Sequence, residues 1–172
     1  MRRFGCITAV GVWEGHKCLF KNRDRNYKPE IRIYHELVSG TEVLYLKDEV
    51  TGWCEGMNQY GIGIINSALA VGMDEKEKEL TKKDVDGKTL RDGKRMLAAL
   101  GKEDLEEALA TIQTHDEGLR GHTIVANSEI TYSLEATWEG HDYHVCKLPR
   151  NTSLANRRIS KKIPKQKQKA AI

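Results

Sequence analysis

Cys6 is the first residue of this sequence whose position suggests chemistry. It follows Gly5 and opens the alternating segment 6–13, and a second segment, 16–22, returns after a tight turn and leads into the polar run 21–25. Paired segments of this kind predict a β-hairpin, whose strand ends lie side by side. Charged side chains would therefore lie beside Cys6, where a cation favours the nucleophilic thiolate.

Two asparagines extend this pattern. Asn66 ends the otherwise apolar segment 61–67, and Asn151 follows the segment 142–148. A side-chain amide at a strand end can donate a hydrogen bond to a developing oxyanion. Taken singly, each asparagine is more typical of a turn or a cap.

The elements that would position these residues alternate between strands and helices. Three hairpins are predicted in the first half, two helices in the middle and three strands afterwards. Their predicted ranges are 6–13 with 16–22, 31–38 with 42–47, 51–57 with 61–67, helices 89–100 and 103–114, and strands 122–127, 130–137 and 142–148. This order predicts an α+β fold with mostly antiparallel sheets rather than a parallel doubly wound fold.

Composition narrows the class of protein. The chain has 172 residues, 39% of them hydrophobic and 31% charged, which is typical of one globular domain. The sequence contains no run of 18 apolar residues, so no membrane span is predicted. No long apolar stretch follows residues 1–5, so we expect no secretory signal and a cytoplasmic protein. Four cysteines without a CxxC pair favour free thiols over disulfides or zinc, and we expect no metal at the HxxH of His141 and His144.

Charge is distributed unevenly along the chain. Residues 150–172 contain eight Lys or Arg and no Asp or Glu, whereas residues 1–149 carry 20 basic and 25 acidic side chains. A basic tail can contact nucleic acid. This tail has no aromatic residue for stacking on bases, so a solvated terminus is the preferred interpretation.

Together these pieces resemble the N-terminal nucleophile hydrolases. The resemblance is closest to the group of choloylglycine hydrolase, penicillin V acylase, acyl-CoA:6-aminopenicillanic acid acyltransferase and the related cysteine dipeptidases. In that group a cysteine is followed by a hairpin ending in a motif like LFGRNxD or LFGKNSDR, and later by GMNExGL and a catalytic asparagine. Here the corresponding pieces are Cys6, LFKNRDR at 19–25, GMNQYGI at 56–62, Asn66, LEAT at 134–137 and Arg150-Asn151.

The resemblance implies a role for each matching residue. Cys6 would be the nucleophile, Asp24 would bind its free α-amino group, and Asn66 and Asn151 would serve the oxyanion hole and orient the amine. The basic residue of the family motif aligns with Lys21 if one glycine is deleted.

Arg23 is the competing candidate for that cation. Family members are usually much longer, and a downstream arginine of the family has no clear match here, so Arg157 or Arg158 would stand in for it. The fold implied is an αββα sandwich of two antiparallel sheets, in a minimal or truncated version.

The family's chemistry also implies that the chain consists of three parts. Cys6 has a free amine, the general base of this chemistry, only after cleavage between Gly5 and Cys6. We therefore expect an autocatalytically removed propeptide at 1–5, a catalytic domain at 6–151 and a basic tail at 152–172. Gly5 leaves the attack on its carbonyl unobstructed.

The expected function is an amidohydrolase or acyltransferase that acts on a linear amide of a small molecule or peptide through a thioester on Cys6. Trp53 and Tyr60 are candidate substrate-binding residues, although both could be core residues. We expect no cofactor or metal, and a homo-oligomer. A catalytically silent domain of the same fold, interacting through its basic tail, is the main alternative; an unrelated nucleic-acid-binding protein is the third.

Overall fold

The computed structural model describes residues 6–23, 28–67, 88–113, 119, 121–136, 143–148 and 154–155. They form two antiparallel sheets and two helices, which confirms the expected α+β class. In the small sheet, the strand order is β10-β1-β2, with β1 at Ile7–Trp13, β2 at His16–Asn22 and β10 at Leu154–Ala155. β10 pairs with β1 although it falls in the segment that the sequence assigned to the basic tail.

The large sheet has seven strands in chain order, each antiparallel to the next. They are β3 (Ile31–Val38), β4 (Thr41–Asp48), β5 (Trp53–Asn58), β6 (Gly63–Ser67), β7 (Gly121–Ala126), β8 (Thr131–Ala136) and β9 (Tyr143–Leu148). The helices are α2 (Lys88–Leu100) and α3 (Leu105–Gln113), close to their predicted ranges.

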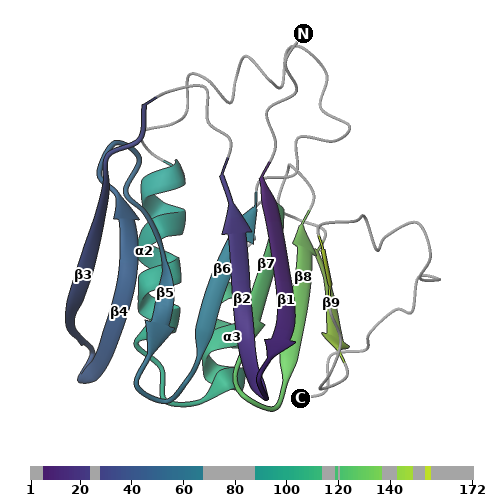
Figure 1. The fold of residues 1–172 in the computed structure, drawn as a ribbon. Helices are drawn as coiled ribbons and strands as arrows, with labels where there is room; N and C mark the ends of the chain where they lie inside the picture. The colour runs from purple at the N-terminus through teal and green to yellow at the C-terminus, as the bar shows by residue number, and fades with distance from the viewer. Residues whose placement is uncertain are drawn as a thin grey trace, which may run out of the picture.

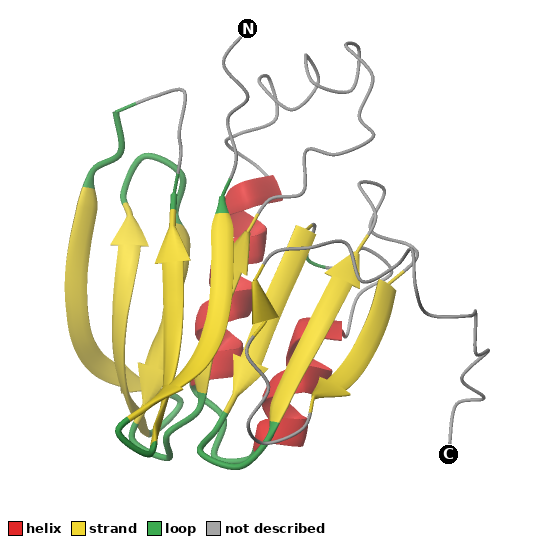
Figure 2. Ribbon diagram, turned by 45° about the vertical axis from the view of Figure 1, so that its right-hand side comes forward, coloured by secondary structure: helices red, strands yellow, loops and turns green. Residues whose placement is uncertain are grey.

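The elements stack in three layers (Figure 1). The small sheet lies over β6 and β7, and both helices lie on the opposite face of the large sheet, with α2 against β5 and α3 against β7. Figure 2 shows the two helices together behind the strands. Within the described residues, no helix covers the outer face of the small sheet, so three layers of the expected four-layer sandwich are present.

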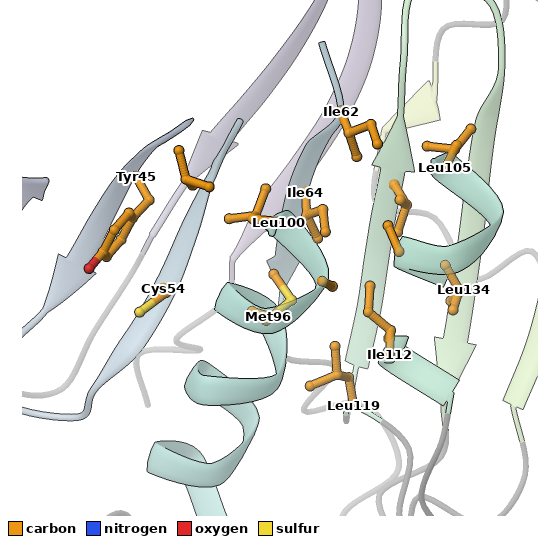
Figure 3. Packing of buried hydrophobic residues seen from close by; sticks show 14 of the residues in the cluster. Tyr45, Cys54, Ile62, Ile64, Met96, Leu100, Leu105, Ile112, Leu119 and Leu134 are labelled. Atoms are coloured by element: carbon orange, nitrogen blue, oxygen red, sulfur yellow. The ribbon is translucent and has the colours of Figure 1, made fainter. Parts of the chain in front are cut away.

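Each side of the large sheet has its own hydrophobic cluster. Strand alternation sends Val43, Ile64 and Val125 toward the helices, where they pack with Met96 and Leu100 (Figure 3). The intervening positions Ile65, Ile124 and Ala126 face the small sheet and form a smaller cluster with Val10 of β1, against which Leu19 of β2 packs. The two sheets are therefore held together by a thin apolar layer.

Glycine is needed at two places in this fold, one in a hairpin turn and one where the two sheets meet. Ser39 and Gly40 both have positive φ and close the two-residue hairpin between β3 and β4, as their sequence predicts. A Cβ at Gly63 would lie 2.6 Å from the Leu19 side chain of the small sheet. The absence of a side chain at Gly63 therefore allows the two sheets to approach each other.

Candidate active site

Cys6 lies at the edge of the interface between the two sheets. It directly precedes β1 and is 8% exposed. Alternation along β1 places it on the inner face with the buried Thr8 and Val10, while Ile7 is exposed on the outer face. Thr8 is registered opposite Lys21, so Lys21 projects from the same face as Cys6, two positions further along the hairpin.

Lys21 crosses from the small sheet to the large one. Its Nζ donates to the Glu55 carboxylate on β5 and to the main-chain carbonyl of Asn66 on β6. The β5–β6 ladder is registered only at Gly56 with Ile64 and Met57 with Gly63, so the two strands separate before they reach Glu55 and Asn66. The ammonium group therefore bridges the two strands where they separate.

Glu55 is the centre of this cluster. Its Oε1 accepts hydrogen bonds from Lys21, from Arg23 Nη2 at 3.3 Å and from the Trp53 indole Nε1 at 2.6 Å. Arg23 also approaches the buried Asp48 carboxylate at 3.8 Å, and its guanidinium lies 5.9 Å from the Trp53 ring centroid. The Glu55 carboxylate therefore orients both Lys21 and Arg23, which the sequence analysis gave as alternative candidates for the cation.

Burial changes the acid–base properties of the cluster. Desolvation lowers the pKa of Lys21 to about 8, although the Glu55 carboxylate partly opposes this shift. A thiolate at Cys6 also favours the charged form of Lys21, so the two groups interact electrostatically. Burial raises the pKa of the Cys54 thiol to about 11, which makes Cys54 a poor nucleophile at neutral pH.

A second polar group lies on the same inner face. The Thr8 hydroxyl is 3.0 Å from His122 Nδ1 and 3.3 Å from the Ser67 hydroxyl, and His122 Nε2 is 2.7 Å from the Ser133 hydroxyl. His122 is 1% exposed, and burial lowers its pKa. This chain of neutral hydrogen bonds fixes β1, and with it the adjacent Cys6, against the large sheet.

Asn66 is placed differently from the sequence expectation. Its side chain shares the helix-side face with Ile64, and its Nδ2 donates to Thr123 Oγ1 at 2.7 Å. Its main-chain carbonyl instead faces Lys21. Because the N–H and C=O of a strand residue point to the same edge, the Asn66 N–H also faces the opening between β5 and β6.

The two predicted substrate-binding aromatics are far apart. Trp53 is 7% exposed and belongs to the Glu55 cluster, so the structure brings it to the site. Tyr60 is 45% exposed in the turn that follows β5, whereas Trp53 lies at the opposite end of that strand. Asn58 in the same turn is structural: its Nδ2 donates to the carbonyls of Leu100 and Lys102, and its Oδ1 accepts from two main-chain N–H groups.

Several predicted residues lie outside the described part of the chain. They are Gly5, Asp24, Asn151, Arg157 and Arg158. The sequence analysis did not identify Glu55 and His122, although the sequence contains a signal for both. Each is a titratable residue in a largely buried strand, a placement that requires a partner.

The described residues contain no group of three His, Cys, Asp or Glu side chains that could hold a metal ion. None of the four cysteines, all of which lie in the described part of the chain, forms a disulfide. None of the helices in the described part of the chain is long and apolar enough to span a membrane. Comparison with known proteins finds neither a matching family model nor a matching curated protein.

Proposed function

We propose that this chain is an N-terminal nucleophile amidohydrolase or acyltransferase that forms a thioester on Cys6. The observation that carries this proposal is the position of Cys6 at the start of β1, on the inner face of the small sheet, beside the cation that crosses to Glu55 and Asn66. The two stacked antiparallel sheets with helices on one outer face are compatible with a minimal αββα architecture.

Processing would begin at the bond between Gly5 and Cys6. Cys6 Sγ attacks the Gly5 carbonyl carbon, the C–N bond breaks, and the released α-amine takes the thiol proton as the acyl group moves to sulfur. Water then hydrolyses the thioester, which releases residues 1–5 and regenerates the thiol. Only after this step does Cys6 carry an amine that can act as a base near neutral pH.

Turnover would use the same sulfur atom. The α-amine, held by Asp24, accepts the thiol proton, and Sγ attacks the carbonyl carbon of the substrate amide. The proton passes to the leaving amine, and water or another amine resolves the thioester. Lys21, positioned by Glu55, supplies the positive charge that favours the thiolate.

The oxyanion would be stabilised by main-chain and side-chain donors together. The Asn66 main-chain N–H is the better candidate in β6, since the Asn66 side chain is bonded to Thr123. Asn151 remains the proposed side-chain donor. Loss of one such donor costs about 2.7–4 kcal/mol of transition-state stabilisation.

The compartment and the assembly are part of the proposal. Four free thiols suit a reducing compartment such as the cytoplasm. We also propose a homo-oligomer, which the exposed apolar residues on both sheets support. The substrate would be a small-molecule or peptide amide.

Intact-mass spectrometry tests the proposal directly. The purified chain should lack residues 1–5, and Cys6→Ala should retain them. A chain expressed as Met followed by Cys6, with the Met removed by aminopeptidase, should hydrolyse members of a panel of N-acyl aminocoumarins, whereas the same chain carrying Cys6→Ala should not. An intact N-terminus together with inactivity of the Met-Cys6 chain would favour the alternative, a silent interaction domain.

A further inference from the structure

β3 forms one edge of the large sheet among the described residues (Figure 1). It is eight residues long and carries exposed apolar side chains on one face: Ile31, Ile33 and Leu37 are 47%, 73% and 68% exposed. Leu44, Leu46 and Met57, about half exposed, continue this apolar strip on β4 and β5. The outward main-chain N–H and C=O groups of a long apolar edge strand can pair with another strand.

The hydrogen-bond pattern shows which main-chain groups point outward. Glu49 N donates to Glu30 O at 2.8 Å, and this pair continues the β3–β4 register, in which Ile31 lies opposite Asp48. In an antiparallel ladder, bonded and non-bonded pairs alternate, so the even-numbered residues of β3 bond to β4. The N–H and C=O groups of Ile31, Ile33, His35 and Leu37 therefore point away from β4.

This alternation restricts how β3 could pair with a second copy of itself. Outward-pointing residues must face outward-pointing residues, which requires the two-fold axis to pass through a residue rather than between two. An axis through Ile33 would place Glu30 opposite Glu36, a repulsive pair. An axis through His35 would place Arg32 opposite the apolar Val38, which offers the guanidinium no opposite charge.

An axis through Tyr34 gives a complementary register. It places Arg32 opposite Glu36 on both sides of the axis, and on the other face Ile31 opposite Leu37 and Ile33 opposite His35. Arg32 is already bonded to Glu30 at 2.7 Å, and Glu36 Oε1 accepts from the Tyr45 hydroxyl at 2.7 Å. A guanidinium with five donors and a carboxylate with a second oxygen retain capacity for one further bond each.

We propose that two copies of this chain associate through antiparallel pairing of their β3 strands, with the two-fold axis at Tyr34, so that the two large sheets become one continuous sheet. The inference is independent of the chemistry at Cys6. The outward main-chain groups of β3 would provide the ladder, and the two Arg32–Glu36 pairs would fix the register.

Charge reversal tests the register. Arg32→Glu or Glu36→Arg alone creates two like-charge pairs across the axis and should raise the dimer dissociation constant by about tenfold or more. The double variant Arg32→Glu with Glu36→Arg should restore the wild-type value. Sedimentation velocity across a concentration series measures all four chains, and circular dichroism verifies that each is folded.

A cysteine cross-link gives a second readout. In the proposed register the two copies of residue 34 form a non-hydrogen-bonded pair with Cα atoms about 4.5 Å apart, within disulfide range. Tyr34→Cys should therefore yield an oxidised dimer on a non-reducing gel. His35→Cys, whose copies lie beyond bonding distance, should match the wild-type background.

Three results would overturn the proposal. One is a wild-type chain that is monomeric at about 100 μM. Another is a dimer dissociation constant that the single charge reversals leave unchanged, or that the double reversal does not restore. The third is equal cross-linking of the residue 34 and residue 35 variants. If a different protein or another segment of this chain covers β3, the first and third results are the ones expected.

Discussion

Lys21 of the small sheet and Glu55 of the large sheet form an ion pair across the interface between the sheets, and their side chains are only 11% and 10% exposed. Glu55 also faces Arg23 and the Trp53 indole, whereas Lys21 has Glu55 as its acidic partner in the described network. The two members of the pair are therefore not equivalent, and their removal should have different consequences.

Glu55→Gln should destabilise the fold more than Lys21→Met. The first change removes the carboxylate that Lys21 and Arg23 share, which leaves Arg23 facing Asp48 at 3.8 Å, whereas after the second change Arg23 still faces Glu55. Leaving a buried charge uncompensated costs about 3–5 kcal/mol, and the Lys21→Met cost should be clearly smaller. Urea denaturation of both variants measures the difference in the free energy of unfolding. Equal costs would mean that Arg23 contributes nothing at Glu55.

The lowered pKa of Lys21 predicts a pH dependence of stability. Between pH 8 and 10.5, Lys21 has lost its proton in the folded state but keeps it in the unfolded state, so the unfolded state binds more protons. The free energy of unfolding of the wild type, relative to Lys21→Met, should therefore rise with pH across this window. Thermal denaturation of both chains from pH 7 to 10.5 tests this. A falling difference would place the folded pKa of Lys21 above its ordinary value.

His122 predicts a dependence of the same sign at acidic pH. Burial lowers its pKa below 6.5, so on acidification the unfolded chain takes up a proton before the folded chain does. Wild-type stability relative to His122→Asn should therefore fall as the pH drops below about 6.5. Denaturation at pH 7.5 and at pH 5.5 gives the comparison. Thr8→Val, which removes the hydroxyl 3.0 Å from Nδ1 and keeps the titratable ring, should retain the acid sensitivity.

Local patterns predicted most of the elements because local chemistry determines them. The turns at Glu14–Gly15 and Ser39–Gly40 adopt the positive φ values that hairpins need, and the helical spacing located both helices. The strand predicted at 51–57 begins instead at Trp53. Thr51 and Gly52 are held in a turn, in which Gly52 N donates to the Asp48 carbonyl at 2.7 Å.

The site depended on contacts between distant segments, which a single sequence does not specify. The partnership of Lys21 with Glu55 spans 34 residues, and that of Thr8 with His122 spans 114. Both require knowing that the first hairpin lies over the large sheet. The direction of the Asn66 side chain was likewise not predictable, because it depends on which face of β6 meets the helices.

Gly93 should be intolerant of alanine although it lies inside a helix. Alanine is favoured over glycine in helices by about 1 kcal/mol. A Cβ at Gly93 would, however, lie 2.0 Å from the main-chain oxygen of Gly52, which cannot move aside cheaply. Gly93→Ala should therefore lower the free energy of unfolding by about 1–3 kcal/mol, as overpacking does. The exposed Ala98 in the same helix is the matched control, since Ala98→Gly should follow propensity alone and cost about 1 kcal/mol.

The reactivity of Cys6 should respond to different extents to loss of the two members of the ion pair. Removing the ammonium in Lys21→Met removes a charge that favours the thiolate, so alkylation of Cys6 by iodoacetamide at pH 7 should slow. Glu55→Gln removes the carboxylate that raises the pKa of Lys21, so Lys21 keeps only part of its charge at pH 7 and alkylation should slow less than in Lys21→Met. Peptide mass mapping resolves the labelled cysteines, and Cys54, whose pKa is raised to about 11, should remain unlabelled as an internal reference. Intact mass must first show that the compared chains share the same N-terminus. If both variants slow alkylation equally, the effect is loss of structure rather than charge, and the assignment of Lys21 as the cation that supports the Cys6 thiolate is wrong.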